Sequence, residues 1–213
     1  MIKKEIFELM TNKLGLRNTI VVVFIIAFVG LSKYSEAHPH VFIDAKIQVH
    51  FDKSGLSGFN VSWTFDNMFS ELMIDEFDTD FDDQLSKEEQ KVIYQKAFVN
   101  LKKFGYFTEI VIDNKTFEIK YVANFSAKID NGILSYSFFI PCHSSIQSSD
   151  KKIEVYTYDN SYYMDVSLTS SSVSFSNSTP YQINSEVVED ETKRYYFEQI
   201  APLVLRMKIH RKL

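Results

Sequence analysis

The spacing of the apolar residues changes abruptly along this chain, and this change constrains the fold more than any other feature. From Phe59 to Phe65 every second residue is aromatic or branched apolar, which predicts a strand with one buried face. From Asp66 onward apolar residues recur every fourth position, at Phe69, Met73 and Phe77. This spacing predicts a helix over residues 66–77 with Asp66 as its N-cap. The fold must therefore combine strands with an inserted helical segment.

Alternating segments and turn signals elsewhere predict an antiparallel sheet around that insert. Aromatic residues make up 15% of the chain, which has only 6 glycines, and this balance favours strands with bulky side chains over a glycine-rich nucleotide fold. A second helix is expected over residues 86–103. We expect an α+β fold, mainly an antiparallel β-sheet or sandwich, as a single domain over residues 38–213 with a helical insert at 66–103. The expected strands are residues 40–51, 59–65, 107–112, 116–122, 133–140, 152–158, 163–168, 172–175 and 203–209.

The first 37 residues have the features of a secretory signal peptide. Basic residues precede the unbroken apolar run Thr19–Leu31, which is too short to span a bilayer comfortably. Ser35 and Ala37 place small residues at −3 and −1 of a cleavage point before His38. An exported, periplasmic protein beginning at His38 is expected, and an uncleaved membrane anchor is the alternative.

Charge and cysteine content exclude several classes of site. The formal net charge is −5, which argues against nucleic-acid binding through a basic surface. The chain has a single cysteine, Cys142, so an intramolecular disulfide and a zinc site made only of cysteines are both excluded.

Residues 78–89, DTDFDDQLSKEE, follow the twelve-residue calcium loop of an EF-hand. The side chains expected to bind Ca²⁺ are those at loop positions 1, 3, 5, 9 and 12, while position 7 offers its backbone carbonyl. Calcium needs six to eight hard oxygen ligands, and this spacing folds that many around one point. The alternative is a solvated acidic loop that caps a helix. The expected ligands are Asp78, Asp80, Asp82, Gln84, Ser86 and Glu89.

Loop position 6 is Asp83, where glycine is expected because the chain turns there with positive φ. Aspartate enters that conformation more readily than most residues, at a cost of about 1 kcal/mol relative to glycine. Extracellular calcium modules bind on the order of 0.1–1 mM, so we expect a structural site rather than a sensor.

Two histidines at the expected mature N-terminus form a second candidate site. His38 would offer an imidazole and a free α-amine, and His40 lies on the same face of the strand. Nitrogen ligands suit Zn²⁺, Ni²⁺, Co²⁺ or Cu²⁺. Pro39 has no amide N–H, which excludes the square-planar amino-terminal copper or nickel site. The alternative is that both histidines are ordinary polar strand residues.

Other candidate ligands are weaker. His50 and His143 are possible distal ligands, but nothing in the sequence places them near His40. Cys142 is more typical of a small buried apolar group than of a ligand. The sequence has no nucleophile elbow, glycine-rich phosphate loop or HExxH motif, so we do not expect an enzyme.

Four segments are similar to those of a known family: AHPHVFIDA (37–45), WTFDNMFSELM (63–73), YFTEIVIDNK (106–115) and YDNSYY (158–163). In these segments the chain resembles a family of exported bacterial proteins of unknown function, described as the periplasmic component of an uncharacterised, metal-linked ABC-type transport system. The resemblance covers nearly all of the mature chain and is most specific in the HPHxFID motif. It implies an accessory role in metal handling, beside nickel/cobalt-type exporters or zinc-linked systems. Members normally have glycine where this chain has Asp83.

The hypothesis from the sequence is a periplasmic metal-binding accessory protein that serves a membrane metal transporter. His38 and His40 would bind a transition ion, and the loop at 78–89 would hold a structural calcium. One alternative is a copper oxidase of the histidine-brace type, for which His38 fits but a second ligand is unidentified. The other is a non-catalytic interaction domain with only a calcium site.

Overall fold

The computed structural model describes residues 39–147 and 150–212. The chain divides into two units, residues 1–37 and residues 38–213. The predicted signal peptide and His38 lie outside the described residues. The second unit consists mostly of antiparallel strands with few helices, in agreement with the expected α+β class.

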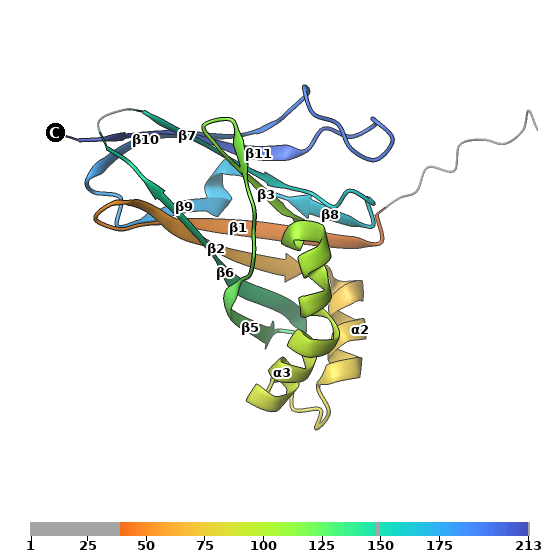
Figure 1. The fold of residues 1–213 in the computed structure, drawn as a ribbon. Coiled ribbons are helices and arrows are strands. Elements are labelled where there is room, and N and C mark those ends of the chain that lie inside the picture. The colour runs from red at the N-terminus through yellow and green to blue at the C-terminus, as the bar shows by residue number, and fades with distance from the viewer. Residues whose placement is uncertain (1–38, 148–149, 213) are drawn as a thin grey trace, which may run out of the picture. The chain divides into compact units, whose positions relative to one another are not determined.

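One sheet has six strands in the order β5-β6-β2-β1-β8, with β9 also paired to β1 (Figure 1). The β1–β2, β2–β6 and β5–β6 pairs are antiparallel. The short strands β8 and β9 both run parallel to β1, which the sequence did not predict. These strands are β1 (Val41–Phe51), β2 (Gly55–Phe65), β5 (Ala123–Asp130), β6 (Ile133–Ser145), β8 (Met164–Ser167) and β9 (Val173–Ser176).

The second sheet has five strands in the order β10-β11-β7-β3-β4, and every pair in it is antiparallel. Strand β11 is the closing strand expected from the alternation near the C-terminus. The strands are β3 (Thr108–Ile112), β4 (Lys115–Phe117), β7 (Lys151–Thr157), β10 (Tyr181–Glu189) and β11 (Leu203–Arg211).

Several strand boundaries differ from the expected ones. Strands β5 and β10 were not predicted, β6 continues beyond residue 140, and β4 ends at Phe117 rather than at residue 122. Strand β2 begins before residue 59 and contains a register shift between Leu56 and Gly58. A Cβ atom at Gly58 would lie 2.4 Å from the carbonyl oxygen of Ile140, so this irregular pairing requires glycine.

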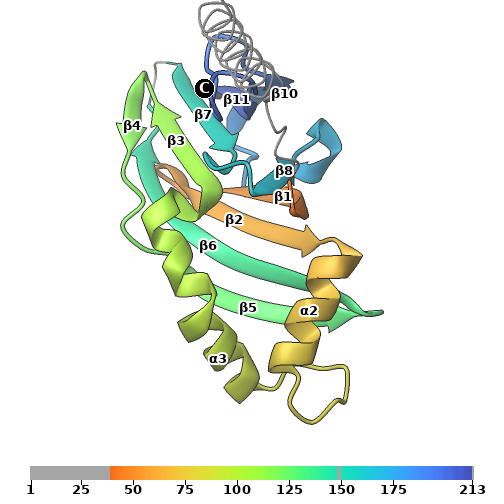
Figure 2. The same ribbon diagram turned by 90° about the vertical axis from the view of Figure 1, so that its right-hand side faces the viewer.

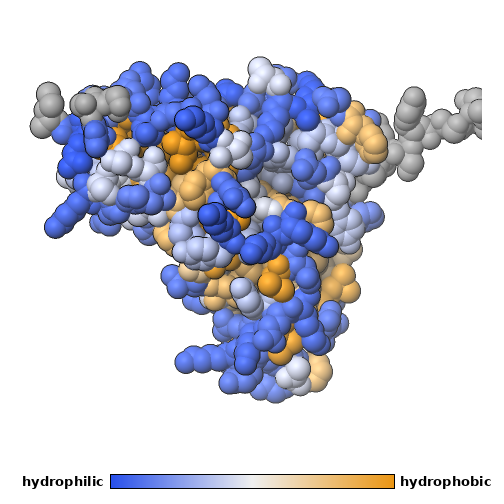
Figure 3. Space-filling model, in the orientation of Figure 1, coloured by the Kyte–Doolittle hydropathy of each residue, from blue (hydrophilic) through white to orange (hydrophobic). Residues whose placement is uncertain are grey.

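The core is formed by side chains from both sheets. Phe59, Val61, Trp63 and Phe65 are all buried, as their alternation predicts. The Trp63 ring lies 4.9 Å from the Phe138 ring and 5.8 Å from the Phe107 ring, measured between centroids. Most of the surface in Figure 3 is hydrophilic, with apolar residues exposed between the strands and the helices.

The helical insert packs on the β5–β6 side of the six-stranded sheet (Figure 2). Helix α2 (Asn67–Phe77) begins at the predicted cap, where Asp66 Oδ1 accepts a hydrogen bond from the Phe69 amide at 2.9 Å. Helix α3 (Lys87–Lys96) is shorter than predicted. The chain continues as the 3₁₀ segment η1 (Phe98–Phe107), which buries Phe98 in the aromatic core.

Candidate metal site in the loop between α2 and α3

Three aspartates come together in the loop that joins α2 to α3. Each of Asp78, Asp80 and Asp82 offers a carboxylate oxygen, and these oxygens lie within 4.8 Å of one another. Asp78 is buried at the end of α2, where its amide still bonds to the Ile74 carbonyl, whereas Asp80 and Asp82 are exposed. This is the one such cluster of metal-ligating side chains within residues 39–147 and 150–212. It contains three of the predicted calcium ligands.

Backbone amides of the loop hold the aspartates in place. The Asp78 carboxylate accepts hydrogen bonds from the amides of Asp82, at 3.4 Å, and Asp83, at 3.0 Å. Asp82 in turn accepts from the Gln84 amide at 2.8 Å. Asp83 has a φ of 59°, the left-handed conformation that the calcium-loop pattern requires at position 6. The loop thus turns where the pattern predicts, although it lacks glycine there.

Glu89 lies in the first turn of α3 with its side chain largely buried. Its Oε1 accepts hydrogen bonds from the Thr79 amide and hydroxyl, both at 2.7 Å. Its Oε2 accepts from the Ser86 amide and hydroxyl, both at 2.9 Å. The Ser86 hydroxyl also accepts from the Glu89 amide, which completes the predicted capping box. Four hydrogen bonds use the whole acceptor capacity of one carboxylate.

The pKa values of two carboxyl groups in the loop shift in opposite directions. The pKa of Asp80 is raised by desolvation and by the negative charges of Asp82, Glu89 and Asp78. The pKa of Glu89 is lowered to about 2, first by the hydrogen bonds from Thr79 and then by those from Ser86. The cluster therefore contains repulsion that a bound cation would relieve.

Glu89 and Ser86 were predicted as ligands, but in this structure they bond to each other, and Gln84 is held through its amide. Calcium ligation by these three residues stays a prediction. The contact from Thr79 was not predicted from the sequence, because Thr79 occupies loop position 2, which supplies no ligand in the calcium-loop pattern.

His40 is exposed just before β1, on the face that also carries Phe42 and Asp44. Its ring lies 5.1 Å from the ring of Tyr163, measured between centroids. Tyr163 is held by the buried carboxylate of Asp159, whose Oδ2 accepts from the Tyr163 amide at 3.2 Å. The segment YDNSYY thus folds into a turn beside His40. The Ser161 amide donates to Asp159 Oδ1, an Asx turn of the kind that an aspartate in a polar segment favours.

The structure does not bring another histidine to His40 within the residues that it describes. His50 is ten residues further along β1, roughly 33 Å away, and bonds to Ser176. His143 lies near Asp52 and Ser54. Cys142 is fully buried, and desolvation raises the pKa of its thiol to about 12. His38, the other predicted ligand, is outside the described residues.

No helix among the described residues is both long and apolar enough to cross a bilayer.

Comparison with known proteins shows the family to which the chain belongs. An uncharacterized protein of Haemophilus influenzae is 28% identical over 144 residues, which is 66% of this chain and 68% of that protein. The family model described as "Protein of unknown function (DUF1007)" matches residues 23–204, and the chain belongs to this family.

Proposed function

We propose that this chain is an exported metal-binding accessory protein in which the loop from Asp78 to Glu89 binds a structural Ca²⁺. The observation that carries the proposal is the cluster of Asp78, Asp80 and Asp82, whose carboxylate oxygens lie within 4.8 Å of one another. The left-handed conformation of Asp83 adds support, because it follows the backbone of a calcium loop.

The residues present suit a hard cation. Three carboxylates supply oxygen ligands, and the Gln84 carbonyl, the Ser86 hydroxyl and water are available to complete the six to eight that calcium takes. Bidentate ligation by Glu89 would require this carboxylate to exchange hydrogen bonds from Thr79 and Ser86 for the cation. Calcium affinity is therefore expected to be modest, in the range of extracellular modules.

A cation in this loop would join two helices that are anchored to different strands. Ser70 on α2 accepts a hydrogen bond from the Leu134 amide of β6 at 3.0 Å. Gln90 on α3 accepts from the Ala127 amide of β5 at 3.2 Å. Fixing the loop between the helices would thus stabilise the β5–β6 edge of the sheet, a structural role.

His38 and His40 would provide the transition-metal function, with Zn²⁺, Ni²⁺, Co²⁺ or Cu²⁺ as the ion and a membrane metal transporter as the partner. Support comes from the exposed position of His40, immediately before β1 and beside Tyr163. We further propose that the protein acts in the periplasm as a binding protein, without catalysis.

The calcium site is tested by calorimetric titration of the chelator-treated protein and by thermal unfolding. We expect one Ca²⁺ to bind with a dissociation constant on the order of 0.1–1 mM. Stabilisation should reach about 1.4 kcal/mol when free calcium is ten times that constant. The D80N/D82N variant should lose both effects, while D75N, at an exposed aspartate of α2, should retain them. Equal behaviour of wild type and D80N/D82N would refute the site.

The histidine site is tested by titrating the secreted protein with each transition ion. Replacing His38 and His40 together by alanine should abolish binding without changing the unfolding temperature. His210→Ala is the matched control, because His210 lies on β11 beside Asp150. Micromolar binding retained by the double variant would refute the assignment.

A further inference from the structure

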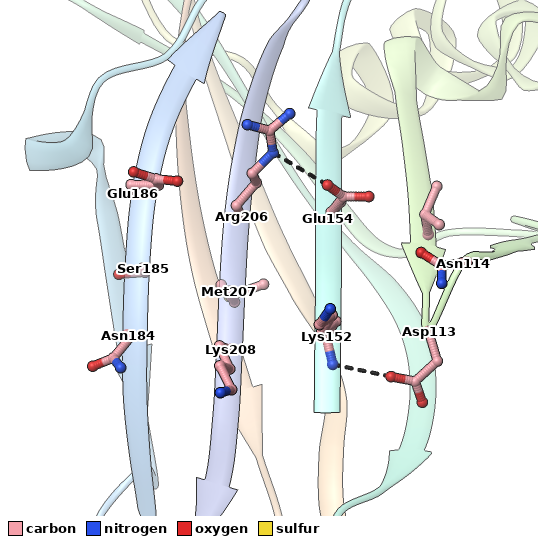
Figure 4. A pocket seen from close by; sticks show the side chains of 11 residues that line it. Asp113, Asn114, Lys152, Glu154, Asn184, Ser185, Glu186, Arg206, Met207 and Lys208 are labelled. Atoms are coloured by element: carbon pink, nitrogen blue, oxygen red, sulfur yellow. Dashed lines mark hydrogen bonds and ion pairs between the residues drawn. The ribbon is translucent and has the colours of Figure 1, made fainter. Parts of the chain in front are cut away.

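A groove of about 460 Å³ lies on the outer face of the five-stranded sheet (Figure 4). Its walls come from β3, β7, β10 and β11. Arg206 and Lys208 alternate along β11 with the buried residues Leu205 and Ile209, so their side chains point away from the core. The volume is in the range of sites that bind small molecules.

Most charges around this groove are neutralised by partners within the fold. The Arg206 guanidinium lies 3.2 Å from Glu154 Oε1 and 3.2 Å from the buried carboxylate of Asp190. Lys208 is paired with Asp150 at 2.7 Å, and Asp113 is paired with Lys151 at 2.9 Å. These contacts fix the walls. Together they carry a net charge of −1, because the Arg206 guanidinium is shared by the carboxylates of Glu154 and Asp190.

Two charged side chains of the groove have no ion pair or side-chain hydrogen bond within the described part of the chain: Lys152 on β7 and Glu186 on β10. The register sets Lys152 directly opposite Lys208. Like charges at such a position repel each other and destabilise the sheet. The fold thus presents one unpaired cation and one unpaired anion at separate positions of a single groove.

The spacing of these two groups defines the ligand. Glu186 lies in one row with Arg206 and Glu154, and Lys152 lies in the next row on the same face, two strands away. Two strand spacings and two residues along the strand separate their Cα atoms by roughly 12 Å. Long side chains on both can shorten that span to the length of two or three extended residues, about 7–10 Å.

We propose that this groove binds a short peptide with free termini, its carboxylate at Lys152 and its amino group at Glu186. The side-chain amide of Asn184 lines the groove in the same row as Lys208 and Lys152, and it can bond to the peptide groups between the two ends. A simple anion fits less well, since Glu186 would repel it while Lys152 attracts it. The dipolar charge pattern selects a ligand that is itself dipolar.

The test is calorimetric titration of the full chain with trialanine, N-acetyl-trialanine and trialanine amide. We expect trialanine to bind with a dissociation constant on the order of 1 mM. Acetylation or amidation should each weaken binding about five-fold, because each removes one exposed ion pair between the peptide and the groove. Lys152→Gln and Glu186→Gln should weaken trialanine binding by the same factor.

The pairing of each end can be tested separately. The E186Q variant should no longer distinguish trialanine from its acetylated form, and K152Q should no longer distinguish it from the amide. Lys128→Gln, an exposed lysine on β5, is the matched control and should bind as wild type does. Absence of binding by wild type at about 10 mM trialanine would overturn the proposal. Binding that is equally strong in K152Q and E186Q would also overturn it.

Discussion

Thr79 and Glu89 lie ten residues apart, and the amide and hydroxyl of Thr79 both donate to the same carboxylate oxygen of Glu89. Ser86 donates in the same way to the other oxygen. The Glu89 side chain therefore joins the start of the acidic loop to its end. The loop is closed by hydrogen bonds alone, and a cation that takes Glu89 as a ligand must replace some of them.

The hydrogen bonds to Glu89 predict acid sensitivity of the metal-free protein. The folded state holds the pKa of this carboxyl at about 2, below its ordinary value of 4.5. Between these values the unfolded chain binds more protons than the folded chain. The contribution of Glu89 to the free energy of unfolding is therefore fully present above pH 4.5 and is lost as the pH drops toward 2. Urea unfolding in chelator at a series of pH values should show this fall, and ¹³C NMR should place the Glu89 midpoint near 2.

Thr79→Val is the matched variant for this effect. It removes the hydroxyl donor and keeps the size of the side chain and the backbone amide. The Glu89 midpoint should move upward and the loss of stability on acidification should become smaller. A Glu89 midpoint near 4.5 in the wild type would contradict the hydrogen-bonded arrangement of the loop.

The left-handed conformation of Asp83 predicts opposite effects of two small substitutions. Asp83→Gly removes the side chain that makes a φ of 59° unfavourable, and the metal-free protein should become more stable by up to about 1 kcal/mol. Asp83→Ala should be less stable than the glycine variant by about 1 kcal/mol, because alanine has neither the freedom of glycine nor a polar group. Urea denaturation compares the two. Equal stability would mean that position 83 is not left-handed in solution.

The Asp66 side chain joins α2 to β1. Replacing it should therefore lower the free energy of unfolding by more than replacing an ordinary helix cap does. One oxygen caps α2 through the Phe69 amide, and the other accepts from the Phe42 amide of β1 at 2.7 Å. Asp66→Ala should destabilise the protein by about 1–3 kcal/mol, and Asp66→Asn by less, because asparagine keeps one acceptor. Urea denaturation measures both. A cost below about 0.5 kcal/mol for alanine would show that neither contact matters.

The apolar alternation predicted the strands that are buried and the start of α2, but it missed one edge strand in each sheet. The two missed strands, β5 and β10, are both edge strands. Strand β10 exposes residues in succession, so it lacks the two-residue pattern. The parallel pairing of β8 and β9 with β1 depends on long-range register, which local patterns do not contain.

In the acidic loop, the clustering of Asp78, Asp80 and Asp82 and the position of the turn at Asp83 could be predicted from the sequence alone. The engagement of Glu89 by Thr79 did not, because it depends on how the loop closes rather than on residue type. The early end of α3 has a similar origin. Its continuation as η1 places Phe98 against Phe138, at a centroid distance of 5.1 Å, and this packing overrides the helical pattern.

Burial of Cys142 predicts a thiol that does not react in the folded protein. The side chain has no exposed surface on β6, and desolvation raises its pKa to about 12, so almost no thiolate forms near pH 8. Ellman's reagent should label less than about a tenth of the native protein in an hour at pH 8, and all of it in urea. Cys142→Ser should lower stability by about 1–3 kcal/mol, because it buries a hydroxyl in an apolar site, whereas Cys142→Ala should cost less. Rapid labelling of the native protein would show instead that β6 opens at this position. If calcium then slowed the labelling, the opening of β6 would depend on the acidic loop.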